Sequence, residues 1–136
     1  VQYAQERKPF GKPLSTNQGI QFPLVELNTT AAMLRALIHK TAWQMDKYGA
    51  FSVSDQVSMC NYIGNRLCCD AADRAMQTHG GLGYSRHKPF EHIYRHHRRY
   101  RITEGAEEIQ MRRIAGYMFG YMKQQAPKGV KSVTGK

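Results

Sequence analysis

The sequence predicts an all-α fold, an antiparallel four-helix bundle, and three observations support this class. Apolar residues recur at steps of three and four along two long stretches, residues 15–48 and the run from 54 to the turn at 80, which is the spacing of one face of an α-helix. No stretch alternates apolar and polar residues with a period of two, so no β-strand is predicted. The connections between the stretches are short, which favours antiparallel neighbours.

The first helix is expected within residues 15–48. One of the polar residues at 15–17 can cap its start, and Gly49 can end it. Pro23 is tolerated near the beginning of the helix and otherwise implies a kink. The apolar positions of this helix are Ile20, Leu24, Leu27, Ala31, Leu34, Ile38, Ala42 and Met45.

Three further helices follow in the sequence. The second is expected from Ser54, an N-cap candidate, to the turn at Gly80, and the third from Pro89 to about Tyr94. The fourth is expected over residues 106–122. Apolar positions in the second and fourth helices are Val57, Cys60, Ile63, Leu67, Cys68, Ala71, Ala75, Met76, Ile109, Ile114, Met118 and Tyr121. Core packing is expected for Met33, Met45, Met76, Met111 and Met118, and a core or interface position for Trp43.

Length and composition fit one small domain and exclude several classes of protein. The chain has 136 residues, of which 41% are hydrophobic. No apolar run approaches the roughly 18–20 residues that a membrane helix needs. Residues 1–10 lack the pattern of a signal peptide and read like the middle of a helix, so we expect a fragment or a processed chain. The three cysteines have no CxxC spacing, which argues against disulfides and zinc and favours a reducing compartment.

The formal charge of +10 has two main sources. Residues 123–136 contain four Lys and no acidic residue, and we expect them to form a disordered, solvated tail. Residues 1–122 are then the folded domain. The second source is the segment 86–101, where six Lys and Arg residues stand against one Glu inside the folded part. This segment either meets an anionic partner or forms a solvated face or a subunit contact.

Histidines and tyrosines are interleaved with the basic residues of this segment. His92 and His96 are four residues apart and share a helix face, which is a spacing that metal ligands can use. Because no cysteine and no second histidine pair accompanies them, no metal site is predicted. Tyr94 and Tyr100 among the arginines also fit a nucleic-acid interface.

Three segments between the helices combine anion-binding or proton-transferring groups with glycine. Arg7, in RKPFG, can form charge-assisted hydrogen bonds to phosphate, and the GGLG turn at 80–83 presents backbone N–H groups that suit phosphate oxygens. Glu104, in TEG, is a candidate general base. Each also has a structural interpretation, respectively a surface charge, a helix stop and an acid that complements the helix dipole.

The order and spacing of these segments resemble the C-terminal α-helical domain of the acyl-CoA dehydrogenases, FAD enzymes that oxidise acyl-CoA thioesters. The similarity covers residues 1–122 and rests on YAQERKPFGKPLSTNQGIQFPLVEL, QTHGGLG and TEGAEEIQ. It implies that the chain is the third domain of an enzyme with an N-terminal helical domain and a central β-domain. It also implies a homodimer or homotetramer through the bundle, and an electron-transfer flavoprotein as electron acceptor.

The resemblance also implies which residues approach FAD. The Arg and Phe of the family's RxxFG motif, which approach the FAD diphosphate of the neighbouring subunit, fall on Arg7 and Phe10. Gln18 matches a position near the nucleotide end of the cofactor. The family's QxxGG segment lines the same cofactor and falls on Gln77, Thr78, His79, Gly80 and Gly81.

Glu104 falls on the catalytic base of the short- and medium-chain enzymes. In these relatives the carboxylate removes a hydrogen from the α-carbon of the thioester while hydride leaves the β-carbon for flavin N5. Gly105 matches a position that lets the thioester lie close. Ala106 and Glu108 occupy cofactor-binding positions that are Thr and Gln in the family, and Thr103 replaces a residue that is often aromatic. These three differences suggest a divergent branch.

The predicted function is α,β-dehydrogenation of an acyl-CoA thioester. This chain alone is expected to be inactive, because the family builds the flavin and acyl sites largely from its other two domains. The alternatives are an oxygen-using flavoenzyme and a DNA-binding, alkylation-response flavoprotein, of which the latter predicts salt-sensitive DNA retention. DNA is the less favoured partner, and no membrane contact is expected. The expected location is the cytoplasm in a bacterium or the mitochondrial matrix in a eukaryote.

Overall fold

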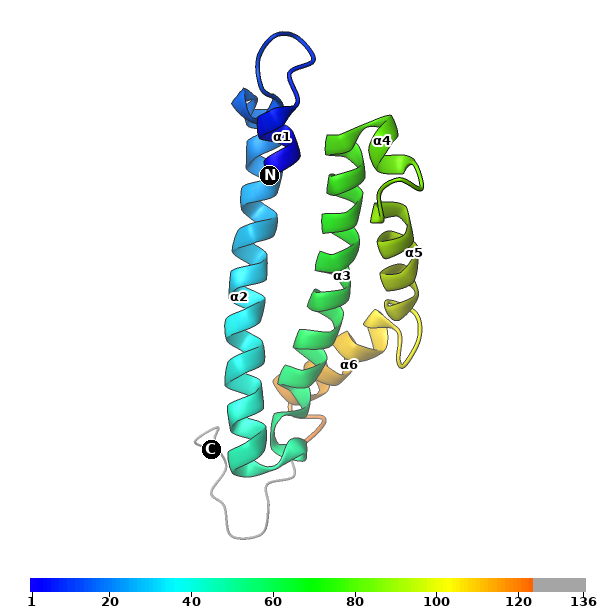
Figure 1. Cartoon of the computed structure of the whole chain (residues 1–136). Coiled ribbons are helices and arrows are strands. Elements are labelled where there is room, and N and C mark those ends of the chain that lie inside the picture. The colour runs from blue at the N-terminus through cyan, green and yellow to red at the C-terminus, as the bar shows by residue number, and fades with distance from the viewer. Residues whose placement is uncertain (124–136) are drawn as a thin grey trace.

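The computed structural model describes residues 1–123, and in this part of the chain every regular element is helical (Figure 1). The all-α class is therefore confirmed. The helices are α1 (Gln2–Glu6), α2 (Gln18–Tyr48), α3 (Ser54–His79), α4 (Gly81–Tyr84), α5 (Phe90–Tyr100) and α6 (Glu107–Met118), with 3₁₀ turns at Leu14–Thr16 and Ala50–Val53. The predicted tail at 123–136 lies outside the described residues, apart from Lys123.

Helix α3 is the central element, and the other long helices pack on it (Figure 1). Helices α2 and α5 lie on opposite sides of α3 and run antiparallel to it, while α6 crosses the first half of α3 obliquely. Helix α1 lies beside the start of α2 and contacts the end of α3. The N-terminal segment is thereby brought next to the turn that follows α3.

The two long helices agree closely with the sequence prediction. Helix α2 begins at Gln18 because the residues before it form the 3₁₀ turn, and Asn17 occupies the N-cap position without a side-chain capping bond. Gly49 ends the helix with φ +87°, a conformation that glycine adopts at little cost. Pro23 lies inside α2, within its first two turns. Helix α3 begins at Ser54, but its N-cap is Val53 and not the predicted serine.

The ends of the two shorter helices differ from the prediction. Helix α5 continues to Tyr100 instead of ending near Tyr94. Its half-buried aromatic and apolar residues follow helical spacing and include the ring of a histidine and the phenol of Tyr100, which a search for aliphatic spacing leaves out. They are Phe90, Ile93, Tyr94, His97 and Tyr100, and Glu91 is half-buried as well. Helix α6 ends at Met118 instead of continuing to 122, since the chain turns at Gly120 with φ +76°.

The buried apolar residues are few and mostly small, namely Ala4, Val53, Cys69, Ala72 and Ile114. The prediction of a core position is wrong for Met33 and Met118, which are 62% and 72% exposed. Trp43 is 56% exposed, which excludes the core alternative for this residue. Met45, Met76 and Met111 are half-buried. Within residues 1–123, no helix has the length and apolar character required to cross a membrane.

Candidate functional site

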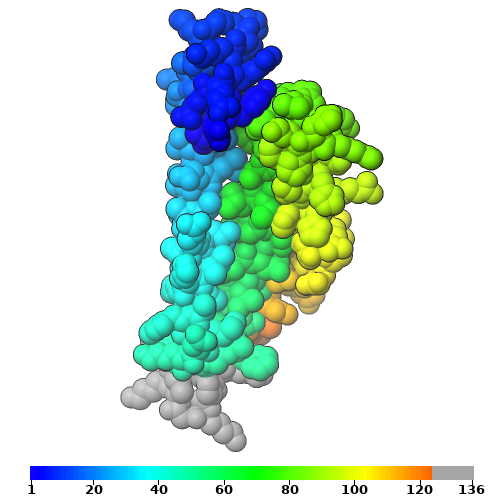
Figure 2. Space-filling view, in the orientation of Figure 1, coloured from blue at the N-terminus to red at the C-terminus, as the bar shows by residue number. Residues whose placement is uncertain are grey.

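A cavity of about 440 Å³ lies where α1, the end of α3 and α4 meet. It is lined by Arg7 and by the segment 77–81, which come from opposite halves of the sequence, together with Tyr3, Leu14 and Leu82. In Figure 2 the N-terminal part of the chain, coloured blue, lies against the green part of the molecule that contains residues 77–81. The fold therefore places two of the three segments singled out from the sequence in one cavity.

Contacts between aromatic rings join the elements around this cavity. The ring of His79 stacks on Tyr3 with 4.0 Å between the centroids, and it lies 4.7 Å from the ring of Phe90. Its Nδ1 atom also lies 2.8 Å from the backbone oxygen of Ala75. The backbone oxygen of His79 also accepts from the Tyr3 hydroxyl at 3.5 Å. Because the imidazole joins α1, α3 and α5 and the carbonyl is bonded to Tyr3, His79 has a structural role at this cavity.

The other predicted cofactor residues differ in how far they are open to solvent. Gln77, Gly80 and Gly81 are exposed, whereas Thr78 is buried and its Oγ1 donates to the backbone oxygen of Arg74 at 2.8 Å. Arg7 is exposed and forms no recorded ion pair with any described residue. Phe10 and Gln18 are also exposed, but they do not line the cavity.

Gly83 allows a close approach between α4 and the end of α3. A Cβ atom added at Gly83 would lie 2.7 Å from both the backbone oxygen of Met76 and the Cβ of His79. The last glycine of GGLG is therefore required for packing, a role that sequence reasoning missed. At Gly81, by contrast, an added Cβ would meet nothing within 4 Å.

Replacing Gly83 by alanine is expected to lower the free energy of unfolding by about 2 kcal/mol, within the range of about 1–3 kcal/mol for overpacking a tight contact. The clash is with backbone, which cannot move aside as a long side chain can. Chemical denaturation of Gly83→Ala beside Gly81→Ala measures the effect. Equal stability of the two variants would contradict the packing role.

Glu104 lies in the loop between α5 and α6, at the opposite end of α5 from the cavity (Figure 1). Its backbone is left-handed with φ +59°, and Gly105 follows with φ +89°. The Nε2 of Gln110 lies 3.4 Å from the backbone oxygen of Glu104 and 3.3 Å from that of Gly105. The side chain of Glu104 is exposed. Next in the chain, half-buried Ala106 is the N-cap of α6, and Glu108 is exposed in its first turn.

A buried carboxylate lies directly after this loop. Arg101 donates to Glu107 Oε2 from Nε at 2.8 Å and to Oε1 from Nη2 at 2.9 Å. Arg66, in the middle of α3, donates to the same two oxygens at 3.1 Å each. The sequence alone allows Glu107 only the role of an acid that complements the dipole at a helix start, and sequence reasoning missed both arginines and Gln110. The participation of Arg66 has no local sequence signal, because Arg66 lies on α3, 41 residues before Glu107 in the chain.

The hydrogen bonds from Arg101 and Arg66 lower the pKa of Glu107 to about 2, from an ordinary value of 4.5. The stability gained from this carboxylate is complete above about pH 4.5 and is lost as the pH falls through about 2. We expect the free energy of unfolding to fall more steeply between these values in the wild type than in Glu107→Gln. Denaturation curves at stepped pH test this, and parallel pH profiles would contradict it.

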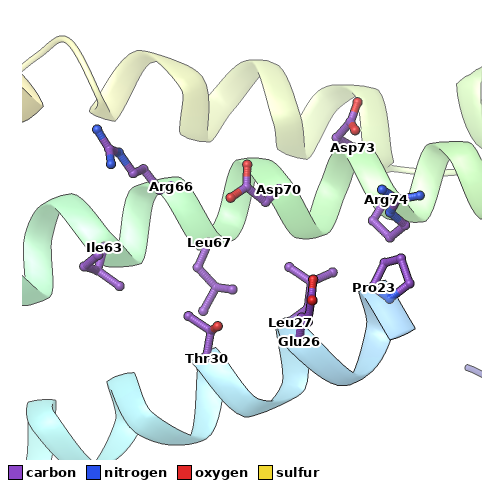
Figure 3. Close-up of a pocket in the computed structure, with 10 residues that line it drawn as sticks. All are labelled: Pro23, Glu26, Leu27, Thr30, Ile63, Arg66, Leu67, Asp70, Asp73 and Arg74. Atoms are coloured by element: carbon purple, nitrogen blue, oxygen red, sulfur yellow. The ribbon is translucent and has the colours of Figure 1, made fainter. Parts of the chain in front are cut away.

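A second hollow, of about 420 Å³, lies between α2 and α3 (Figure 3). In this view Leu67 and Thr30 point toward each other, whereas Arg66 points away from α2, on the side from which it reaches Glu107. Asp73 and Arg74 lie near one end of the hollow. None of the predicted site residues lines it.

The basic segment forms an exposed surface on α5. A broad hollow of about 830 Å³ is lined there by Arg86, Lys88, Pro89, Glu91, His92, Arg95, His96 and Arg99. Partial desolvation and the charge of Arg99 lower the pKa of His96. The rings of His92 and His96 are 6.3 Å apart. Within residues 1–123, no group of three or more His, Cys, Asp or Glu side chains is arranged to hold a metal ion.

Comparison with known families assigns the chain, with its cavity at the end of α3 and its Glu104 loop, to one family. Residues 1–119 match the family model described as "Acyl-CoA dehydrogenase, C-terminal domain". The chain belongs to the acyl-CoA dehydrogenase family. The cavity at the end of α3 and the loop of Glu104 are thus parts of an acyl-CoA dehydrogenase C-terminal domain.

Individual relatives agree with this assignment. A probable acyl-CoA dehydrogenase, FadE2 of Mycobacterium tuberculosis, is 33% identical over 115 residues, which are 85% of this chain and 28% of that protein. The caffeyl-CoA reductase-Etf complex subunit CarC of Acetobacterium woodii is 30% identical over 118 residues, 87% of this chain and 31% of the relative. The chain therefore spans about three tenths of the length of these curated relatives.

A solved structure shows the same fold. The glutaryl-coenzyme A dehydrogenase in complex with glutaryl-CoA superimposes with a TM-score of 0.86 at 27% sequence identity. The matched region covers 96% of this chain and 33% of that one. An acyl-CoA dehydrogenase C-terminal domain is thus shown by both sequence and structure.

Proposed function

We propose that the protein containing this chain catalyses the α,β-dehydrogenation of an acyl-CoA thioester with Glu104 as the base. The observation that carries the proposal is the exposed carboxylate of Glu104 within the residues matched to the family's C-terminal domain. It is an exposed carboxylate held by a left-handed backbone just before α6. An exposed carboxylate on a loop fixed at both ends can meet a substrate that a neighbouring domain presents.

The cavity at the end of α3 fits a dinucleotide cofactor such as FAD. The Arg7 guanidinium is free to form two charge-assisted hydrogen bonds to a diphosphate. Gly80 and Gly81 carry no Cβ and meet nothing within 4 Å of where one would lie, so phosphate oxygens can approach the backbone. Gln77 is exposed on the same rim. FAD, when bound, would supply the acceptor for the hydride that leaves the β-carbon.

The cavity and Glu104 are expected to serve different cofactor molecules. They lie at opposite ends of α5, so one helix separates the diphosphate contacts from the base. In a homodimer or homotetramer, Arg7, Phe10 and the segment 77–81 would contact the cofactor of a neighbouring subunit. Ala106 and Glu108, at the start of α6, would lie near the flavin that works with Glu104, together with Gly105 on the substrate side. Gln18 would lie toward the nucleotide end.

The expected electron acceptor is an electron-transfer flavoprotein. The Acetobacterium woodii relative is named as a subunit of a reductase-Etf complex, which supports this partner. The same relative is named as a reductase, so the experiment must also determine whether the thioester is oxidised or reduced. In the reductive direction Glu104 would return the proton to the α-carbon.

The visible spectrum of the full-length gene product tests the proposal. Under anaerobic conditions, a panel of acyl-CoA thioesters is added and the flavin absorbance is followed. Bleaching by saturated thioesters supports dehydrogenation, and the thioester that bleaches fastest identifies the substrate class. A bound flavin that no thioester bleaches would overturn the proposal and favour the oxygen-using or DNA-binding relatives, for which Arg98 and Arg99 are the residues to replace.

A further inference from the structure

One buried carboxylate closes the loop that carries Glu104. Arg101 directly follows α5 and Glu107 begins α6, so only residues 102–106 lie between them. The two residues are joined by the side-chain hydrogen bonds of 2.8 and 2.9 Å and by a backbone bond from the Glu107 N–H to the Arg101 oxygen at 3.1 Å. The ends of the loop are therefore fixed to each other twice.

The same carboxylate fixes the loop to the central helix. Arg66 projects from the middle of α3 and donates to both oxygens of Glu107. Both Glu107 oxygens thus accept from two guanidinium groups, and its side chain is only 10% exposed. Glu107 has no remaining contact to offer a substrate, which separates its role from that of Glu104.

The conformation of Glu104 requires such support. A residue other than glycine in the left-handed region is strained, and it persists only where its surroundings determine it. No described side chain donates a recorded hydrogen bond to the Glu104 carboxylate. Gln110 reaches only the backbone oxygens of the loop. The direction in which the Glu104 side chain leaves the loop is consequently set by the backbone of residues 102–106.

We propose that Glu107, held between Arg66 and Arg101, is a positioning residue that fixes the backbone at Glu104 and with it the direction in which the Glu104 side chain leaves the loop. This inference rests on the proposed function, in which Glu104 is the base. Glu107 acts through the loop backbone and touches neither substrate nor cofactor. A misplacement of the base by about 1 Å can slow a reaction by about a hundredfold, so a loosened loop has a measurable effect.

The test compares Glu107→Gln with the wild type in the full-length flavin-loaded protein. We expect the rate of flavin reduction at saturating thioester to fall by about tenfold or more. The half-saturating thioester concentration and the flavin content should stay within about twofold, because neither depends on the base. Hydrogen exchange of the 102–106 amides should become faster. Glu107→Asp, which keeps the charge, should recover part of the rate.

Two further variants complete the test. Asp73→Asn removes an exposed carboxylate from α3 and should leave all four quantities unchanged. If Glu107→Gln fails to fold, Arg66→Met replaces it, because the Arg101–Glu107 pair then remains across the loop. Its expected effect is a fall of about threefold in the reduction rate, with faster exchange at 102–106.

The outcomes separate this inference from the proposed function. A rate of flavin reduction in Glu107→Gln equal to that of the wild type would overturn the positioning role. A fall in rate that is matched by loss of flavin or of thioester affinity would also overturn it, because that pattern indicates general destabilisation. If Glu104→Gln reduces flavin at the wild-type rate, the proposed function itself fails.

Discussion

Replacing Glu104 by glutamine is expected to slow flavin reduction by the best thioester by about a thousandfold, since a positioned general base contributes about 10²–10⁴ to a rate. The amide keeps the size and shape of the side chain but cannot accept a proton from the α-carbon. Because the Glu104 side chain is exposed and makes no recorded bond within residues 1–123, its loss should not disturb the fold. Stopped-flow absorbance of the full-length protein measures the change.

The matched control for Glu104→Gln is Glu26→Gln. Glu26 is an exposed carboxylate on α2, far along the chain from the loop, and its replacement should leave the reduction rate unchanged. Thermal unfolding and the flavin spectrum should be the same for both variants and the wild type. A Glu104→Gln protein that still bleaches rapidly would place the base elsewhere.

Replacing Arg101 by methionine is expected to lower the free energy of unfolding by about 3 kcal/mol, at the low end of the roughly 3–5 kcal/mol for breaking a buried ion pair. The variant leaves Glu107 buried with Arg66 as its remaining charged partner. Arg101 is the more buried of the two arginines, since its side chain is 23% exposed and that of Arg66 is 39% exposed. Arg66→Met should therefore cost less, about 1 kcal/mol.

The control for this prediction lies on α5. Arg95 is exposed among other cations, so Arg95→Met removes the same charge from a surface where it is repelled. We expect its stability to stay within about 0.5 kcal/mol of the wild type. Chemical denaturation of the three variants gives the order Arg101→Met, Arg66→Met, Arg95→Met. The opposite order would show that Glu107 is stabilised by something other than the two arginines.

The regular part of the fold could be predicted from the sequence because α2 and α3 are long and amphipathic. Their apolar spacing and the terminating Gly49 and Gly80 are local signals. The sequence predicts too short a helix at α5, since its packed face includes His97 and Tyr100, which are not aliphatic residues. The exposure of Met33 could not be predicted, because helical spacing alone does not reveal how much of a helix its neighbours cover.

The candidate site was predictable only where one short segment carries the signal. Glu104 and Arg7 stand out because glycines accompany them, and the sequence singled out both. The hydrogen bonds around Glu107 depend on Arg66 from α3, and the stacked rings at the cavity depend on the contact between Tyr3 and His79. Such contacts between distant segments arise from tertiary packing, and a single sequence does not encode them in any local pattern.

The position of α5 between the cavity and Glu104 has a consequence for evolution. An inserted or deleted residue in an α-helix turns everything beyond it by about 100° and shifts it by about 1.5 Å. Such a change within Phe90–Tyr100 would rotate Glu104, the proposed base, relative to the cavity at the end of α3, while leaving the residues that line that cavity in place. We therefore expect length changes among natural variants of this protein to accumulate elsewhere in the chain, and α5 to keep a constant number of residues.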